Sequence, residues 1–160
     1  MFKRSILLSA LIVVSTFTAS CTPVGEPAAD NEAETPAFRP ALDAHLATIS
    51  ALDLEGFNKT LTSGGDLNVI FPNGTLVPDT QAVRDFHAEW FSDKGWFMEP
   101  EVIKVIEGKD MATALIKYSY RDNAKSETSM NWLVLVFKLE DGAWKLVHDQ
   151  NTKIEDLAAG

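Results

Sequence analysis

Four β-rich runs fill the second half of this chain and limit the folds open to it. They cover residues 101–107, 112–121, 128–139 and 144–152. The segments between them are short and contain Gly, Asp or Asn, which are typical of tight turns between antiparallel strands. Helical patterns dominate the first half, so the chain has helices first and an antiparallel meander afterwards. This order predicts a single folded domain of the α+β class.

The first half of the chain predicts three helices and one strand. Leu42, Leu46 and Ile49 recur at helical spacing and predict the first helix. Asp53 is the predicted N-cap of a second, short helix, because its carboxylate can accept hydrogen bonds from exposed backbone amides. A β-rich run follows and ends at a Pro-Asn-Gly turn, and an amphipathic third helix comes after it. These elements cover residues 40–50, 53–61, 67–71 and 79–91.

Residues two apart in a strand share a face, so each strand has an inward and an outward set. In the last three runs, the predicted inward residues are Ile116, Tyr118, Tyr120, Asn131, Leu133, Leu135, Phe137, Trp144, Leu146, His148 and Gln150. The predicted outward residues are Lys117, Ser119, Arg121, Trp132, Val134, Val136, Lys145, Val147, Asp149 and Asn151. Trp132, Val134 and Val136 form an apolar patch on the outer face, which predicts a homodimer through the sheet.

Cys21 is the only cysteine of the chain and ends a segment with the order of an export signal. Lys3-Arg4 come first, then an apolar run over residues 6–17, then Ala19-Ser20. The apolar run of about 12 residues is shorter than the ~20 that a spanning helix needs. The segment resembles a bacterial lipoprotein signal peptide, which implies lipidation of Cys21. Cleavage to an unlipidated exported protein and a retained anchor are the alternatives.

The chain therefore divides into a signal peptide over 1–20, a tether over 21–37 and a folded domain over 38–160. The tether is rich in Pro and acidic residues and has few apolar ones, so it cannot bury enough surface to offset its ordering entropy. The lipoprotein resemblance implies the bacterial cell envelope, with lipid on Cys21 as the membrane anchor. Thr22 after the cysteine implies the outer membrane, with the domain facing the periplasm.

The chain is acidic, with 23 acidic and 14 basic side chains and a formal net charge of −9. Two of the basic side chains, Lys3 and Arg4, lie in the predicted leader. A domain of this charge repels phosphate backbones, so no nucleic-acid partner is expected. Charge would not hold the domain to an anionic membrane either, which leaves attachment to the lipid.

Three segments resemble the SnoaL-like superfamily, which includes ketosteroid isomerase and nuclear transport factor 2. They are the run Ala51-Leu52-Asp53-Leu54-Glu55-Gly56, the turn Phe71-Pro72-Asn73-Gly74 with the helix over 81–91, and the closing run from Gly142 to Asp149. The resemblance covers the whole predicted domain. It implies a cone in which a curved antiparallel sheet wraps the N-terminal helices. Such cones have an apolar pocket at one end and often dimerise through the outer face of the sheet.

The catalytic residues of the isomerase do not carry over to this chain. Phe71 stands where the resemblance places the aspartate base, and a phenyl ring cannot take a proton. The oxyanion tyrosine corresponds to His45, and the partner acid falls within the apolar residues 133–135. Steroid isomerase chemistry of that kind is therefore not expected, because sites are built on folds residue by residue. A histidine-based acid/base site of another design stays open.

Six residues are predicted to line the pocket: Phe71, His87, Trp90, Tyr118, Tyr120 and Asn131. The polar tips among them must find partners or a ligand. His148 is the first candidate for a catalytic base, because the alternation points it inward, and His45 is the second. Each of these two is as well explained by a structural role. His87, among aromatic residues, is favoured as a hydrogen-bonded core or rim histidine.

Two classes of function fit these observations. The favoured one is a lipid-anchored domain that binds a small apolar ligand or a protein partner, since no carboxylate is expected at the pocket floor. The alternative is an enzyme of isomerase, cyclase or lyase type, with His148 or His45 as general base and Tyr118 or Asn131 steadying an oxyanion. No metal or cofactor is expected, because ligand spacings and phosphate-binding glycine loops are absent from the sequence.

Overall fold

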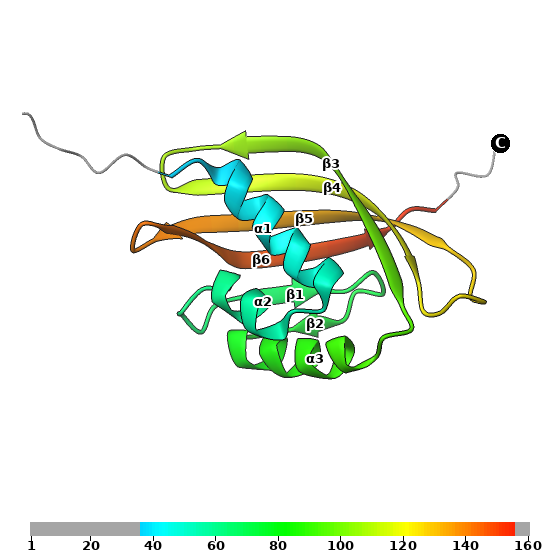
Figure 1. Ribbon diagram of the computed structural model, residues 1–160. Coiled ribbons are helices and arrows are strands. Elements are labelled where there is room, and N and C mark those ends of the chain that lie inside the picture. Colours follow the sequence, from blue (N-terminus) through cyan, green and yellow to red (C-terminus); the bar gives the residue numbers. More distant parts are fainter. Residues whose placement is uncertain (1–35, 156–160) are drawn as a thin grey trace, which may run out of the picture. The chain divides into compact units, whose positions relative to one another are not determined.

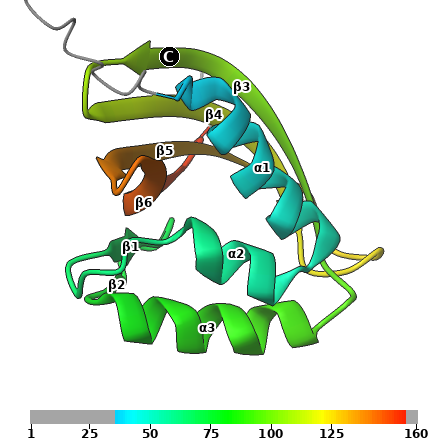
Figure 2. The same cartoon turned by 60° about the vertical axis from the view of Figure 1, so that its left-hand side comes forward.

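The structure is a computed structural model and describes residues 36–155. This part of the chain forms a curved sheet with helices on its concave face. Figures 1 and 2 show all three of its helices on the same face of the six-stranded sheet. This arrangement confirms the predicted α+β class. The predicted signal peptide, Cys21 and nearly all of the predicted tether lie outside the described residues.

The helices are α1 (Phe38–Ala51), α2 (Leu54–Thr60) and α3 (Thr80–Ser92). Two of the three helices begin at a capping aspartate, and α1 begins without a side-chain cap. Asp53 caps α2, as predicted, and accepts a hydrogen bond from the Gly56 amide at 2.9 Å. Asp79 caps α3 in the same way through the Ala82 amide at 2.9 Å. None of the helices within residues 36–155 is long and apolar enough to cross a membrane.

The sheet contains the predicted meander and one strand that was not predicted. Its strands are β1 (Asn68–Ile70), β2 (Leu76–Val77), β3 (Phe97–Glu107), β4 (Met111–Arg121), β5 (Ser129–Glu140) and β6 (Ala143–Lys153). The order is β2-β1-β6-β5-β4-β3, with β1 parallel to β6 and all other neighbours antiparallel. The two-residue β2 is too short to leave a periodic signal, and β3 begins four residues before its prediction.

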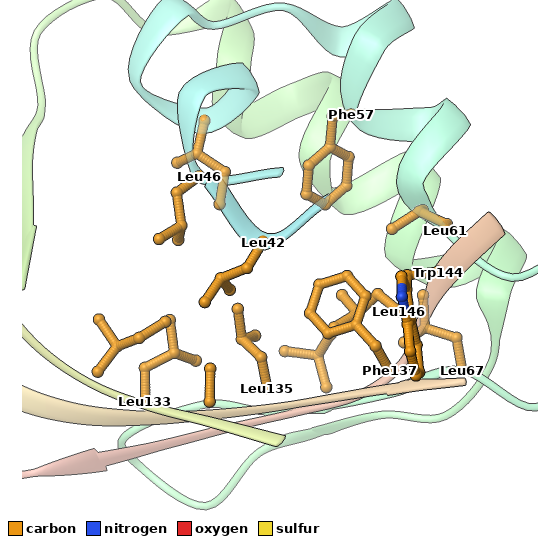
Figure 3. Packing of buried hydrophobic residues seen from close by; sticks show 14 of the residues in the cluster. Leu42, Leu46, Phe57, Leu61, Leu67, Leu133, Leu135, Phe137, Trp144 and Leu146 are labelled. Atoms are coloured by element: carbon orange, nitrogen blue, oxygen red, sulfur yellow. The ribbon is translucent and has the colours of Figure 1, made fainter. Parts of the chain in front are cut away.

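The core lies between the concave face of the sheet and the helices. Figure 3 shows side chains of β5 and β6 facing those of α1 and α2: Leu133, Leu135, Phe137 and Leu146 against Leu42, Leu46 and Phe57. Leu42, Leu135 and Phe137 are fully buried. Burial alternates along β4 and β5 as predicted, with Ile116 and Tyr118 on the inner face and Lys117 and Trp132 on the outer one.

Strand β6 breaks the predicted alternation with a β-bulge. Val136 of β5 pairs with His148, but the next residue, Phe137, pairs with Leu146, so Val147 is an extra residue on β6. Such a residue shifts every later side chain of its strand to the opposite face. Asp149 consequently pairs with the inward residue Leu135. The predicted inward orientation of His148 and Gln150 is therefore wrong, as is the outward one of Asp149 and Asn151.

Candidate functional site

A cavity of about 430 Å³ lies between α3 and the sheet. Its sheet wall consists of the end of β4, the start of β5 and the part of β6 after the bulge. All six residues predicted to line a pocket border it: Phe71, His87, Trp90, Tyr118, Tyr120 and Asn131. The remaining wall residues are Ile49, Val69, Pro72, Phe86, Met98, Ser129, Leu133, Asp149, Asn151 and Lys153. Its volume falls in the range of small-molecule sites.

One wall of the cavity is aromatic and comes from α3 and the turn after β1. Phe71 and Phe86 pack with ring centroids 4.7 Å apart, and Phe86 stacks on Trp90 at 5.9 Å. Trp90 in turn stacks on Trp96 with centroids 4.3 Å apart, and this contact restricts the orientation of the Trp90 ring. This wall provides flat apolar surface for a ligand.

The opposite wall, on the sheet, carries a chain of hydrogen bonds. The Tyr118 hydroxyl donates to Asn151 Oδ1 at 2.8 Å. Asn151 Nδ2 donates to Asp149 Oδ1 at 2.7 Å and to the Ile70 carbonyl at 3.2 Å. Both amide hydrogens and the amide oxygen of Asn151 are thus occupied, so its orientation and that of the Asp149 carboxylate are fixed.

Asp149 is a carboxylate in a mostly apolar cavity. Burial raises the pKa of Asp149 to about 7, and the hydrogen bond from Asn151 only partly opposes that rise. Within residues 36–155, Asp149 Oδ2 makes no hydrogen bond, whereas Oδ1 is held by Asn151. Asp149 therefore has one oxygen that can take and return a proton near neutral pH.

His87 lines the cavity as a neutral side chain. Its Nδ1 donates to the Val83 carbonyl at 2.8 Å, so Nε2 carries no proton and can only accept. Its ring stacks on Phe57 with centroids 4.1 Å apart. Burial lowers the pKa of His87 to about 4, although the bond to Val83 opposes this. His87 is a hydrogen-bond acceptor for a ligand and a weak base.

The structure does not bring His45 or His148, the two predicted bases, to this cavity. His45 is buried against Phe57 and Phe137, and its Nδ1 bonds Thr60 Oγ1 at 2.7 Å. Burial lowers the pKa of His45 to about 3, which keeps it neutral. The bulge turns His148 to the outer face, where its Nδ1 donates to Asn68 Oδ1 at 2.6 Å. Both side chains tie elements of the fold together.

Sequence reasoning missed Asp149 and Asn151, which form the hydrogen-bonded chain of this wall. Simple alternation, counted from Trp144, placed both on the outer face. One signal could have found them: the two are spaced by two residues, so any shift of register moves both polar groups into the pocket together. Among residues 36–155, no three His, Cys, Asp or Glu side chains gather in a way that could hold a metal ion.

The family comparison agrees with this architecture. The sequence pattern of the SnoaL-like domain matches residues 39–151. The chain belongs to the SnoaL-like domain family. The match spans most of the described residues and confirms the resemblance drawn from the run at 51–56, the turn at 71–74 and the closing run at 142–149. A search of curated proteins finds no match to this SnoaL-like chain.

Solved structures share the fold of this SnoaL-like domain at low sequence identity. A ketosteroid isomerase-like protein from Erwinia carotovora atroseptica has a TM-score of 0.62 at 15% identity, over 78% of this chain and 99% of that one. A nuclear transport factor 2-like protein from Pseudomonas putida has a TM-score of 0.64 at 13% identity, over 76% and 87%. A cystatin-like fold protein from Caulobacter vibrioides has a TM-score of 0.63 at 17% identity, over 77% and 91%. These likenesses concern the fold alone.

Proposed function

We propose that this SnoaL-like domain is an acid/base enzyme that transfers a proton on a small, mainly apolar molecule bound in the cavity. The observation that carries the proposal is the Asp149 carboxylate, which lines an apolar cavity and has its pKa raised to about 7. A base with a pKa near the working pH combines the correct charge state with a useful driving force. The reaction class that fits is isomerisation, cyclisation or elimination through abstraction of a proton next to a carbonyl.

The sequence had favoured a non-catalytic binding domain for one reason, the expected lack of a carboxylate at the pocket floor. Asp149 supplies that carboxylate, so the preference changes to the enzyme. Asn151 holds Asp149 Oδ1 and leaves Oδ2 for the transferred proton. Asn131 uses one of its two amide hydrogens to bond Ser129 Oγ, and the other is a donor on the same wall that can stabilise a developing enolate.

Deuterium incorporation tests the proposed function without a known substrate. The domain is incubated in D₂O with a panel of aryl ketones and alicyclic ketones, and exchange at the carbon next to the carbonyl is followed by NMR. We expect at least one compound to exchange faster than in buffer, with a rate that rises through a pKa near 7. A panel-wide absence of acceleration, with binding of the same compounds demonstrated, would contradict an acid/base role.

We propose that the domain is exported and anchored through lipid on Cys21, which would place the cavity at the periplasmic side of the outer membrane. The order of basic, apolar and small residues before Cys21 supports this. Cys21→Ser removes the acceptor for the lipid, so the protein should move from the membrane fraction to the soluble periplasmic fraction, as measured by fractionation and immunoblotting. Persistence of the variant in the membrane fraction would argue for a retained anchor instead.

We also propose that the domain forms a homodimer through the outer face of the sheet. Large apolar side chains with substantial exposure lie along this face: Phe97, Ile106, Met111, Met130 and Trp132. Light scattering on the chain from residue 22 onward should give twice the monomer mass. Trp132→Lys should give the monomer, because it puts a charge in the centre of the patch. Ala124→Lys adds the same charge in an exposed turn and should leave the dimer intact. A monomeric parent protein would overturn the proposal.

A further inference from the structure

The last inward position of β6 is Lys153, an exposed residue that borders the cavity. It is the only Lys or Arg among the residues that line the cavity. From this placement we infer that Lys153 selects ligands that carry an anionic group, so the substrate class is a small organic acid with an apolar body. The inference rests on the proposed function, since it concerns the ligand of the same cavity.

The bulge in β6 brings Lys153 to the cavity together with Asp149. Asp149, Asn151 and Lys153 are spaced by two residues after the bulge, so they share the inner face of the strand. Their partners on β5, Leu135, Leu133 and Asn131, point inward as well. Without the extra residue at Val147, the cation would point away from the cavity.

The spacing along the strand sets a length for the ligand. A strand rises about 3.3 Å per residue, so the four residues from Asp149 to Lys153 separate their backbones by about 13 Å. The Lys153 side chain can reach several ångströms back along the wall. The anionic group and the carbon that gives up its proton should therefore lie on the order of 10 Å apart or less.

The Lys153 ammonium has no competing partner in the described part of the chain. Within residues 36–155, Lys153 takes part in no ion pair and in no side-chain hydrogen bond. The chain as a whole carries a formal charge of −9 and repels anions. A single cation beside an apolar cavity is the local feature that would let an organic anion bind.

Two fluorescent probes with the same aromatic body test this inference. 8-Anilinonaphthalene-1-sulfonate carries a negative charge, and N-phenyl-1-naphthylamine is the matching uncharged molecule. The chain from residue 22 onward is suitable, because every described element and the whole described core lie within residues 36–155. Affinities are measured at low salt, where the Debye length is long.

Lys153→Met should weaken binding of the sulfonate by up to about fivefold, the upper end of the range of an exposed ion pair, and leave the neutral probe unchanged. Lys153→Arg should retain the parent affinity. Lys125→Met is the matched control: it removes the same charge from the exposed turn between β4 and β5 and should change neither affinity. The sulfonate should also displace the neutral probe from the parent protein, which places both in one cavity.

Three results would each overturn the inference. Lys153→Met could weaken both probes equally, it could leave the sulfonate unaffected, or the sulfonate could fail to displace the neutral probe. The outcome is separate from that of the deuterium experiment. Charge selection at Lys153 without any exchange would leave an anion-binding domain and remove the enzyme. Exchange without charge selection would leave the enzyme and remove the anion.

Discussion

Asp149→Asn is expected to reduce the deuterium exchange of a responsive ketone by a factor of about 10² to 10⁴, the usual contribution of a general base. The replacement has the same shape, and its amide oxygen can still accept the hydrogen bond that Asn151 gives to Asp149 Oδ1. The cavity should therefore keep its form and its affinity for N-phenyl-1-naphthylamine. Only the group that takes the proton is lost. The measurement is the exchange rate by NMR under identical conditions for both proteins.

A matched control is Glu99→Gln, which neutralises a carboxylate on the outer face of the sheet, where Glu99 pairs with Ser119. This variant should exchange at the parent rate. Loss of exchange in both variants would indicate a general effect of charge and would remove Asp149 as the base. Retention of the parent rate in Asp149→Asn would have the same consequence, because no other residue of the cavity wall combines a proton acceptor with a pKa near neutrality.

Most of the fold follows from local signals in the sequence. The caps at Asp53 and Asp79 fix where α2 and α3 begin, and the turns at 108–110 and 141–142 fix the hairpins of the meander. Alternation along β4 and β5 is unbroken, so the inward positions of Tyr118 and Asn131 were correctly predicted. These features depend on neighbouring residues, which a sequence shows directly.

The candidate site depends on one feature that the sequence does not show. The bulge at Val147 arises where β6 must pair with β5 on one side and with the short parallel strand β1 on the other. That is a tertiary condition, and Val147 itself is an ordinary strand residue. The sequence therefore predicted His148 as the pocket residue: it identified the strand correctly but placed this side chain on the wrong face. The neighbouring residue, Asp149, is the one that the fold presents to the cavity.

Asp149→Asn is also expected to stabilise the protein, by about 4 kcal/mol at pH 8. The pKa of Asp149 is about 7 in the folded state against an ordinary value of 3.8, so above pH 7 the folded state holds a charge that the unfolded state accommodates more easily. Each pKa unit corresponds to roughly 1.4 kcal/mol. As the pH falls from 7 toward 3.8 the folded state regains its proton and the penalty disappears. The gain of the variant should thus shrink to about 1 kcal/mol at pH 4.5.

His45 and His87 lower the stability of both the parent protein and the Asp149→Asn variant at acid pH. Their folded pKa values of about 3 and about 4 lie below the ordinary 6.5, so below pH 6.5 the unfolded state binds two protons that the folded state rejects, and stability falls. In the parent protein, protonation of Asp149 offsets about half of that loss. Asp149→Asn has no such offset and should lose about 4 kcal/mol between pH 6.5 and 4.5, against about 2 for the parent. Urea unfolding at pH 8, 6.5 and 4.5 measures both curves. Parallel curves would mean that Asp149 titrates in the folded protein as it does in the unfolded chain, and the carboxylate could then no longer be regarded as a base set by its cavity.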